Sequence, residues 1–154
     1  MKELLLLSLD QAFDASSWHG PNLRGSLRGV KVDHALWRPA TDRHSIWDQV
    51  LHCAYWKYAV LRRLRGEKKG SFPRKQSNWP IASGDDAKAW KADIGLLVDM
   101  HRKLREAIVE LGPRQLRATP KGRKTSNLDV ITGIAAHDLY HAGQIQLLKR
   151  LSHG

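Results

Sequence analysis

Cysteine and long apolar runs are both scarce in this 154-residue chain, and each absence excludes a class of protein. The single cysteine, Cys53, excludes a disulfide within the chain and fits a reducing compartment. No apolar run approaches the roughly 18 residues of a membrane-spanning helix. The leucine-rich start follows Glu3, is short and lacks a small-residue cleavage site, so we do not interpret it as a secretion signal. We therefore expect a cytoplasmic protein with no membrane partner.

Acidic residues are also few, because 15 of them accompany 26 lysines and arginines, which gives a formal net charge of +11. Such an excess is typical of proteins that bind nucleic acid, a membrane surface or anionic small molecules. It is concentrated in two segments between predicted helices, residues 67–80 and 113–125. No helix-turn-helix, zinc-finger or RNA-binding signature accompanies the charge, so we expect these segments to serve an anionic small molecule or solubility.

Alternation of polar and apolar residues, which is typical of strands, is missing, and apolar residues instead recur every three or four positions. This spacing predicts four principal helices, at residues 3–15, 45–66, 84–111 and 126–151, with short turns at 22–30 and 32–37. Residues 16–21 interrupt or kink the first helix, and residues 113–125 are expected to form a loop. We predict one domain, residues 1–154, folded as an all-α four-helix bundle with extra short helices or a kinked first helix.

Histidine is present where apolar core positions are expected. His137 and His141 lie four apart in an apolar helical run, so both imidazoles leave the same face of the helix. His52 lies in a second such run, and its neighbour Cys53 points about 100° away, toward the core. An isolated pair is a weak signal, and a lone buried histidine is more often bonded to a carbonyl. Three histidines facing one core each need a partner, however, and one shared cation supplies all three. We predict a divalent metal site formed by His52, His137 and His141.

Three neutral imidazoles leave a tetrahedral ion one open position, where it could polarise a bond or lower the pKa of water or of a thiol. Nitrogen ligation suits nickel or zinc, with iron or manganese as alternatives. Gln144 is a candidate for orienting a ligand or substrate, Trp56 for the pocket wall, and His19 for an extra ligand or acid–base group. The competing roles are core packing for Trp56 and an exposed loop position for His19. Asp138 is expected at the solvated surface.

These residues together resemble the DinB/YfiT-like superfamily of metalloenzymes. The likeness is carried, in order and spacing, by Ser45–Trp47, Val50–His52, His137–Ile145, Trp18–Pro21 and Arg38–Pro39. The resemblance implies a four-helix bundle with non-sequential helix neighbours, nickel or zinc on His52, His137 and His141, and a homodimer. Characterised relatives include thiol-dependent transferases and isomerases that use low-molecular-weight thiols. The basic segments depart from the pattern of the superfamily.

Three functions follow from these features. The first is a metal-dependent thiol transferase or hydrolase that acts on an anionic small molecule, with the basic segments beside the mouth of the metal site. The second is a basic nucleic-acid-binding module with a structural metal, in which Trp79 would stack on bases. The third is a catalytically silent metal-binding protein.

Overall fold

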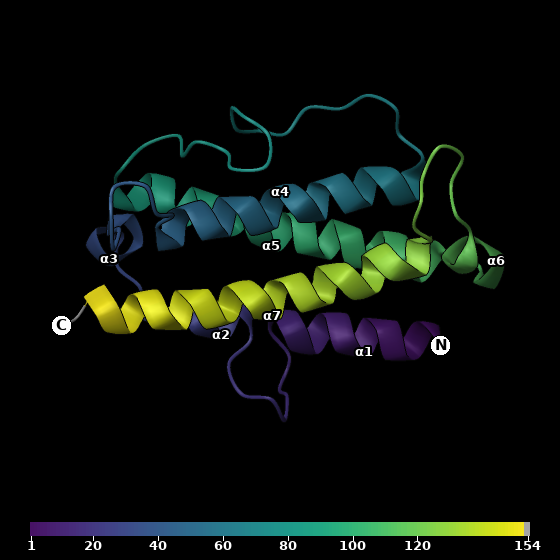
Figure 1. Cartoon of the computed structure of the whole chain (residues 1–154), viewed down its shortest axis with the longest axis horizontal. Coiled ribbons are helices and arrows are strands. Elements are labelled where there is room, and N and C mark those ends of the chain that lie inside the picture. Colours follow the sequence, from purple (N-terminus) through teal and green to yellow (C-terminus); the bar gives the residue numbers. More distant parts are fainter. Residues whose placement is uncertain (153–154) are drawn as a thin grey trace.

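The computed structural model describes residues 1–152, so the last two residues of the predicted 1–154 domain lie outside it. Four long helices form a bundle: α1 (Lys2–Phe13), α4 (Ile46–Arg65), α5 (Ala87–Glu110) and α7 (Asn127–Ser152). Three short helices connect them: α2 (Leu23–Ser26), α3 (Val32–Leu36) and α6 (Pro113–Arg117) (Figure 1). The predicted all-α fold is confirmed over the described range, which contains no strand. Within that range, no helix combines the length and the apolar character needed to cross a membrane.

Local signals in the sequence set the ends of the helices. Ser45 accepts a hydrogen bond from the backbone N–H of Asp48, whose carboxylate accepts the N–H of Ser45 at 2.8 Å. This reciprocal cap begins α4, which ends at Gly66 with a φ of 67°, a conformation that favours glycine. The prediction of a plain loop at 113–125 is wrong in its first part. Pro113 begins α6, where its missing N–H costs nothing, and Leu116 anchors that turn in the core.

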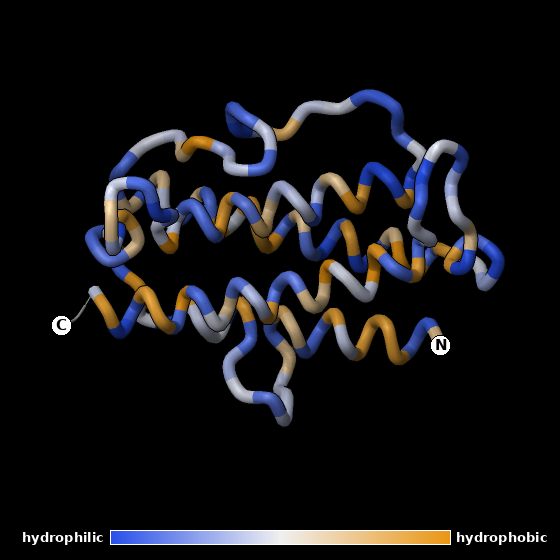
Figure 2. The backbone as a smooth tube through the Cα atoms, in the orientation of Figure 1, coloured by the Kyte–Doolittle hydropathy of each residue, from blue (hydrophilic) through white to orange (hydrophobic). Residues whose placement is uncertain are grey.

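The helices do not pack in chain order. Helix α7 lies between α1 and α4, and α5 packs against α4 and α1, so the ring runs α1–α7–α4–α5 (Figure 1). Apolar positions recur along each long helix (Figure 2) and fill two interior clusters, one around Trp47 and Leu97, the other around Leu9 and Leu104. This order places α4 beside α7, the two helices that carry the predicted metal ligands.

The long connection between α4 and α5, residues 66–86, runs back over the outside of α4 (Figure 1). A buried carboxylate fixes its course: Asp93 of α5 accepts hydrogen bonds from Arg74 Nε and from the indole N–H of Trp47, each at 2.7 Å. With Arg74 held in this way, the chain carries Asn78 and Trp79 to the N-terminal half of α4.

A buried ion pair joins α4 to α7. Lys57 Nζ lies 2.5 Å from Asp138 Oδ2, and neither residue is exposed to solvent. The expectation that Asp138 lies at the surface is therefore wrong. Burial raises the pKa of Asp138 to about 6, while the charge and the hydrogen bond of Lys57 act in the opposite direction. Removing two charges from water is costly unless they meet, so we infer that this pair sets the register of α7 against α4.

Breaking the pair on one side should destabilise the protein strongly. Asp138→Asn leaves the Lys57 ammonium buried and unpaired, with an expected cost of about 3–5 kcal/mol in the free energy of unfolding. The double variant Lys57→Met/Asp138→Leu should be about as stable as the wild type or more stable, since apolar groups replace both charges. Urea denaturation at pH 8 measures both. Arg102→Gln, which removes exposed ion pairs on α5, is the control and should change little. A tolerated Asp138→Asn would remove the register role.

Candidate metal centre

The structure brings the three predicted histidines together between α4 and α7. His52 projects from the second turn of α4, and His137 and His141 project from successive turns in the middle of α7. The Nε2 atom of His137 lies 3.1 Å from Nε2 of His52 and 3.1 Å from Nε2 of His141. Three nitrogens on one tetrahedral ion lie about 3.3 Å apart when the bonds are about 2.0–2.1 Å long. The expected convergence is confirmed, and these separations fit a single metal ion.

The outer nitrogens of two rings are held by oxygen acceptors. His52 Nδ1 lies 2.6 Å from the carbonyl oxygen of Asn78, and His141 Nδ1 contacts the side-chain oxygen of Gln49. Because these oxygens only accept, each Nδ1 carries the proton and each Nε2 presents its lone pair to the common centre. Lone pairs aimed at one point repel one another unless a cation or a shared proton lies between them. The residues present therefore form the donor set that a divalent metal requires.

The loop residues Asn78 and Trp79 hold His52 from outside α4. Asn78 adopts a left-handed backbone conformation, with a φ of 66°, that aims its carbonyl at His52. Trp79 stacks on the His52 ring, with the ring centroids 3.9 Å apart. His44 stacks on the other face of Trp79, with centroids 3.4 Å apart. No pattern in the sequence indicates this arrangement, because the path of a long loop leaves no periodicity.

Trp56 has a different role from the predicted one. It is 39% exposed, and its ring meets His52 only edge-on, with centroids 6.3 Å apart. Its indole N–H donates to the side-chain oxygen of Asn78 at 2.9 Å. Trp56 therefore holds the loop that positions His52, while Trp79 forms the wall of the pocket.

Burial lowers the pKa values of all three imidazoles. The pKa of His137 falls to about 4 and that of His141 to about 3, first through desolvation and then through the neighbouring histidines. Burial also lowers the pKa of His52, although its hydrogen bond to Asn78 opposes this effect. At His141 the side chain of Gln144, as a hydrogen-bond acceptor for the imidazole, likewise opposes the lowering of the pKa. At pH 7 the rings are neutral, which is the form that binds metal.

A second group, Cys53, His137 and Asp138, also has its ligand atoms within 4.8 Å of one another. It is a poorer donor set, because Asp138 is engaged by Lys57. Burial, and then the charge of Asp138, raises the pKa of the Cys53 thiol, so the sulfur keeps its proton, whereas the thiolate is the ligand. Cys53 is fully buried, as its assignment to the core predicts.

A cavity of about 480 Å³ opens beside the three histidines. Gln144 lines it, as expected, together with Tyr140 from the same face of α7. The remaining walls are mostly apolar, with the polar Gln49 and two basic side chains: Pro39, Arg43, His44, Gln49, Trp79, Leu147 and Leu148. The centre is therefore open to a small molecule on one side and enclosed by protein on the other.

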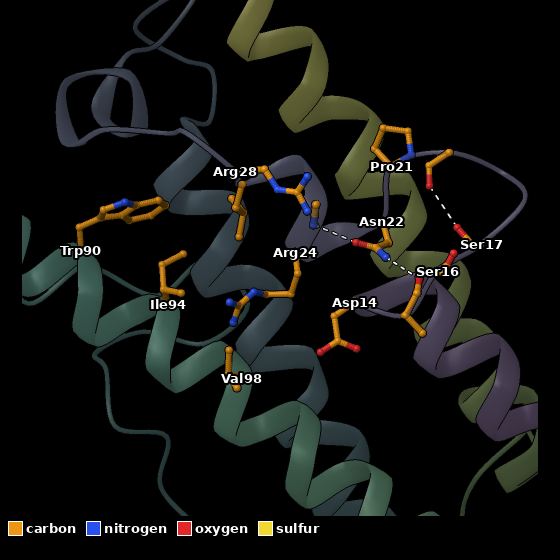
Figure 3. Close-up of a pocket in the computed structure, with 14 residues that line it drawn as sticks. Asp14, Ser16, Ser17, Pro21, Asn22, Arg24, Arg28, Trp90, Ile94 and Val98 are labelled. Atoms are coloured by element: carbon orange, nitrogen blue, oxygen red, sulfur yellow. Dashed lines mark hydrogen bonds between the residues drawn. The ribbon is translucent and has the colours of Figure 1, made fainter.

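His19 lies elsewhere, and its predicted role as an extra ligand is wrong. It is exposed in the turn after α1, where its ring lies 3.4 Å from the hydroxyl of Ser17, and it does not line the histidine cavity. The interruption after α1 instead borders a separate cavity of about 950 Å³, which Ile94 and Val98 of α5 line opposite Arg24 (Figure 3). Although α1 packs against α7, no residue of the break after α1 lines the histidine cavity.

Only the end of the first basic segment, Asn78 and Trp79, reaches the triad, and none of the lysines and arginines of the two segments lines the histidine cavity, contrary to the expectation that they flank its mouth. Lys68, Lys121 and Arg123 line a third cavity, of about 490 Å³, at the C-terminal end of α4. At about 1.5 Å per residue, the end of α4 lies about 20 Å from His52 along the helix. In the first basic segment, residues 67–80, Arg74 forms an ion pair with Asp93.

Comparison with known proteins gives one family match. The model of the DinB superfamily matches residues 17–145, a span that includes all three histidines. No curated protein and no solved structure matches the chain significantly.

Metal content should depend on all three histidines. We expect His52→Ala, His137→Ala and His141→Ala each to lose the divalent ion in elemental analysis of untagged protein. Gln49→Ala removes the acceptor behind His141 and should weaken metal affinity by about 10- to 100-fold. His19→Ala is the matched control and should retain full metal content. Unchanged content in His52→Ala would exclude a site shared between α4 and α7.

Metal-free protein should lose stability as pH falls below about 6.5, the value for an unfolded histidine. The folded-state pKa values of His52, His137 and His141, and of the buried His101, are all lowered, so the unfolded chain binds more protons. The raised pKa of Asp138 acts in the opposite direction, but it is one group against four. Urea midpoints at pH 7.5 and 5 should show the fall. The fall in the urea midpoint should be smaller in His137→Gln/His141→Gln than in the wild type, and in His19→Gln it should equal that of the wild type. Equal falls in the wild type and both variants would contradict the assignment of this pH dependence to the buried histidines.

Proposed function

Since the chain belongs to the DinB superfamily, we propose that it is a metal-dependent enzyme whose divalent ion is held by His52, His137 and His141. One observation carries the proposal: three neutral Nε2 atoms converge at the wall of an open cavity and not inside a closed core. Structural zinc sites are closed by four protein ligands, whereas catalytic sites keep one position open. Three histidines beside a cavity match the second pattern.

Nickel or zinc is the ion we propose. Both accept an all-imidazole donor set, whereas iron in oxygenases and manganese favour sites that include carboxylates. The carboxylate nearest the triad in sequence, Asp138, is buried against Lys57 and so is already neutralised. This arrangement weakens the case for the iron and manganese alternatives.

The proposed reaction joins a low-molecular-weight thiol to an electrophilic small molecule, with hydrolysis as the alternative. A bound ion would lower the pKa of the thiol or of water. Gln49 and Asn78 hold His141 and His52 in the tautomers whose Nε2 lone pairs point toward the common centre. Gln144 and Tyr140, on the rim, are placed to orient the substrate. The superfamily resemblance supports the thiol, and the apolar side of the cavity suits the body of a small organic substrate.

An anionic substrate is supported by Arg43, which among residues 1–152 is the one arginine or lysine that lines the histidine cavity. Its guanidinium can bind a carboxylate at the mouth while the reacting end of the substrate reaches the triad. We also propose that the protein is a cytoplasmic homodimer. The superfamily resemblance supports the dimer, and the scarcity of cysteine supports the compartment.

The stacking of Trp79 weighs against a nucleic-acid-binding role. Both faces of its indole are covered, one by His44 and the other by His52, so no face is free for a base. Base stacking requires an accessible aromatic face.

Turnover by nickel- or zinc-loaded protein tests the proposal. We expect metal-dependent conjugation in a panel of low-molecular-weight thiols with a chromogenic electrophile, falling to background in His137→Ala. With a carboxylate-bearing electrophile, Arg43→Gln should raise KM with little change in kcat, because it removes binding distant from the reacting atoms. Arg117→Gln, a surface change outside the cavity, is its control. Fully loaded protein that turns over neither thiols nor esters would favour the catalytically silent alternative.

A further inference from the structure

We propose that the cavity at the C-terminal end of α4 is a second ligand site, which binds the diphosphate or triphosphate group of a small molecule. Segments far apart in the sequence form it: the end of α4 with the loop after it, and the loop between α6 and α7. Five basic side chains line its volume of about 490 Å³: Arg62, Arg63, Lys68, Lys121 and Arg123. Glu67 is the one acidic residue among the lining groups.

These cations are not neutralised by the protein. Among residues 1–152, every ion pair uses other basic groups, such as Arg74, Arg102 and Arg105. No side chain or carbonyl in that range accepts a hydrogen bond from the ends of Lys68, Lys121 or Arg123. Burial, and then the charge of Arg123, lowers the pKa of Arg63, with Asp129 opposing, as expected where like charges gather.

The arginines from α4 are fixed by protein contacts, while the cations from the loops are free to bind a ligand. Arg63 donates to the hydroxyl of Thr125 at 3.1 Å and to the carbonyl of Ser126 at 3.2 Å, which ties the second loop to α4. Arg62 lies over the ring of Tyr58, 5.5 Å from its centroid. The Nε atoms of both arginines are buried without a hydrogen-bond partner. The two arginines are thus held in place, and the three loop cations that line the same cavity remain available to a ligand.

Two simpler explanations account for only part of this arrangement. The negative end of the α4 dipole attracts the arginines of its last turn, but it does not explain cations that come from two other segments. Solubility is served equally well by dispersed charges, whereas like charges gathered around one cavity repel one another. A bound anion offsets that repulsion.

The number of cations indicates the class of anion. A single carboxylate is matched by one arginine, whereas five cations around one cavity suit a group with three or four negative charges. Duplex DNA would need a charged surface that follows the phosphate backbone and an element that enters a groove. Two loops that enclose a cavity offer neither, so a condensed phosphate on a small molecule fits better.

Calorimetric titration with pyrophosphate at constant ionic strength, about 0.15 M, tests the site. We expect saturable binding of one pyrophosphate per chain, weakened about tenfold or more in Lys121→Gln/Arg123→Gln, which removes two charge-assisted contacts. Arg114→Gln/Arg117→Gln is the matched control, because it removes the same charge from the same segment outside the cavity. The control should bind within about twofold of the wild type. Equal weakening in both double variants would mean diffuse attraction and would overturn the proposal.

Further experiments distinguish binding at this site from binding at the metal centre and from nucleic-acid binding. His137→Ala should bind pyrophosphate as the wild type does, so the result does not depend on metal or on turnover. Without added anion, Arg123→Gln should melt no lower than the wild type, since it relieves repulsion. Its folding is thereby checked independently of binding. A 20-base-pair duplex that binds tightly at the same salt concentration through Lys121 and Arg123 would replace the small-molecule site with a nucleic-acid one.

Discussion

The contact between Lys57 and Asp138 is the constraint on which the metal centre depends. Asp138 adjoins His137 on α7, and Lys57 lies on the same helix as His52, so one buried ion pair links the two halves of the triad. A shift of α7 by one residue would rotate His137 by about 100° and leave two charges buried without partners. Apolar packing alone penalises such a shift less, because apolar contacts are not directional. The pair therefore contributes specificity of register, whatever its net contribution to stability.

The loop between α4 and α5 provides the second half of this organisation. The helices place three Nε2 atoms together and fix the His141 ring through Gln49, but they leave the tautomer and orientation of His52 open. Asn78 supplies the acceptor that fixes His52, and Trp79 supplies the stacked surface behind it. Both depend on the anchoring of Arg74 by Asp93, a contact with α5. The site is thus built by three elements: the loop determines which nitrogen of His52 faces the common centre, and Gln49 of α4 does the same for His141.

The features of this structure that depend on local spacing could be predicted from the sequence. Apolar periodicity predicted the long helices, and the four-residue spacing on α7 with His52 on a second helix predicted the convergence. The positions of residues that depend on long-range contacts were not predicted. Asp138, for example, was assigned to the surface because charged residues usually lie there. A signal existed in Lys57, which follows Cys53 by one turn on the apolar stripe of α4 and so required a buried partner. No comparable signal distinguished Trp79 from Trp56, because loop paths are set by tertiary contacts. His19 was misplaced because chain order does not give helix order in the bundle.

The separation of charge from the metal centre changes what the net charge of +11 implies. Three cations of the two basic segments, Lys68, Lys121 and Arg123, line the cavity at the end of α4, about 20 Å from His52 along the helix. At physiological ionic strength, interactions between exposed charges are screened over about 8 Å. The distant cluster therefore cannot raise the concentration of an anionic substrate at the triad, where Arg43 is the lysine or arginine that lines the cavity. Overall basicity is thus no guide to the substrate of the metal centre, and the gathered cations require an explanation of their own at the other end of the bundle.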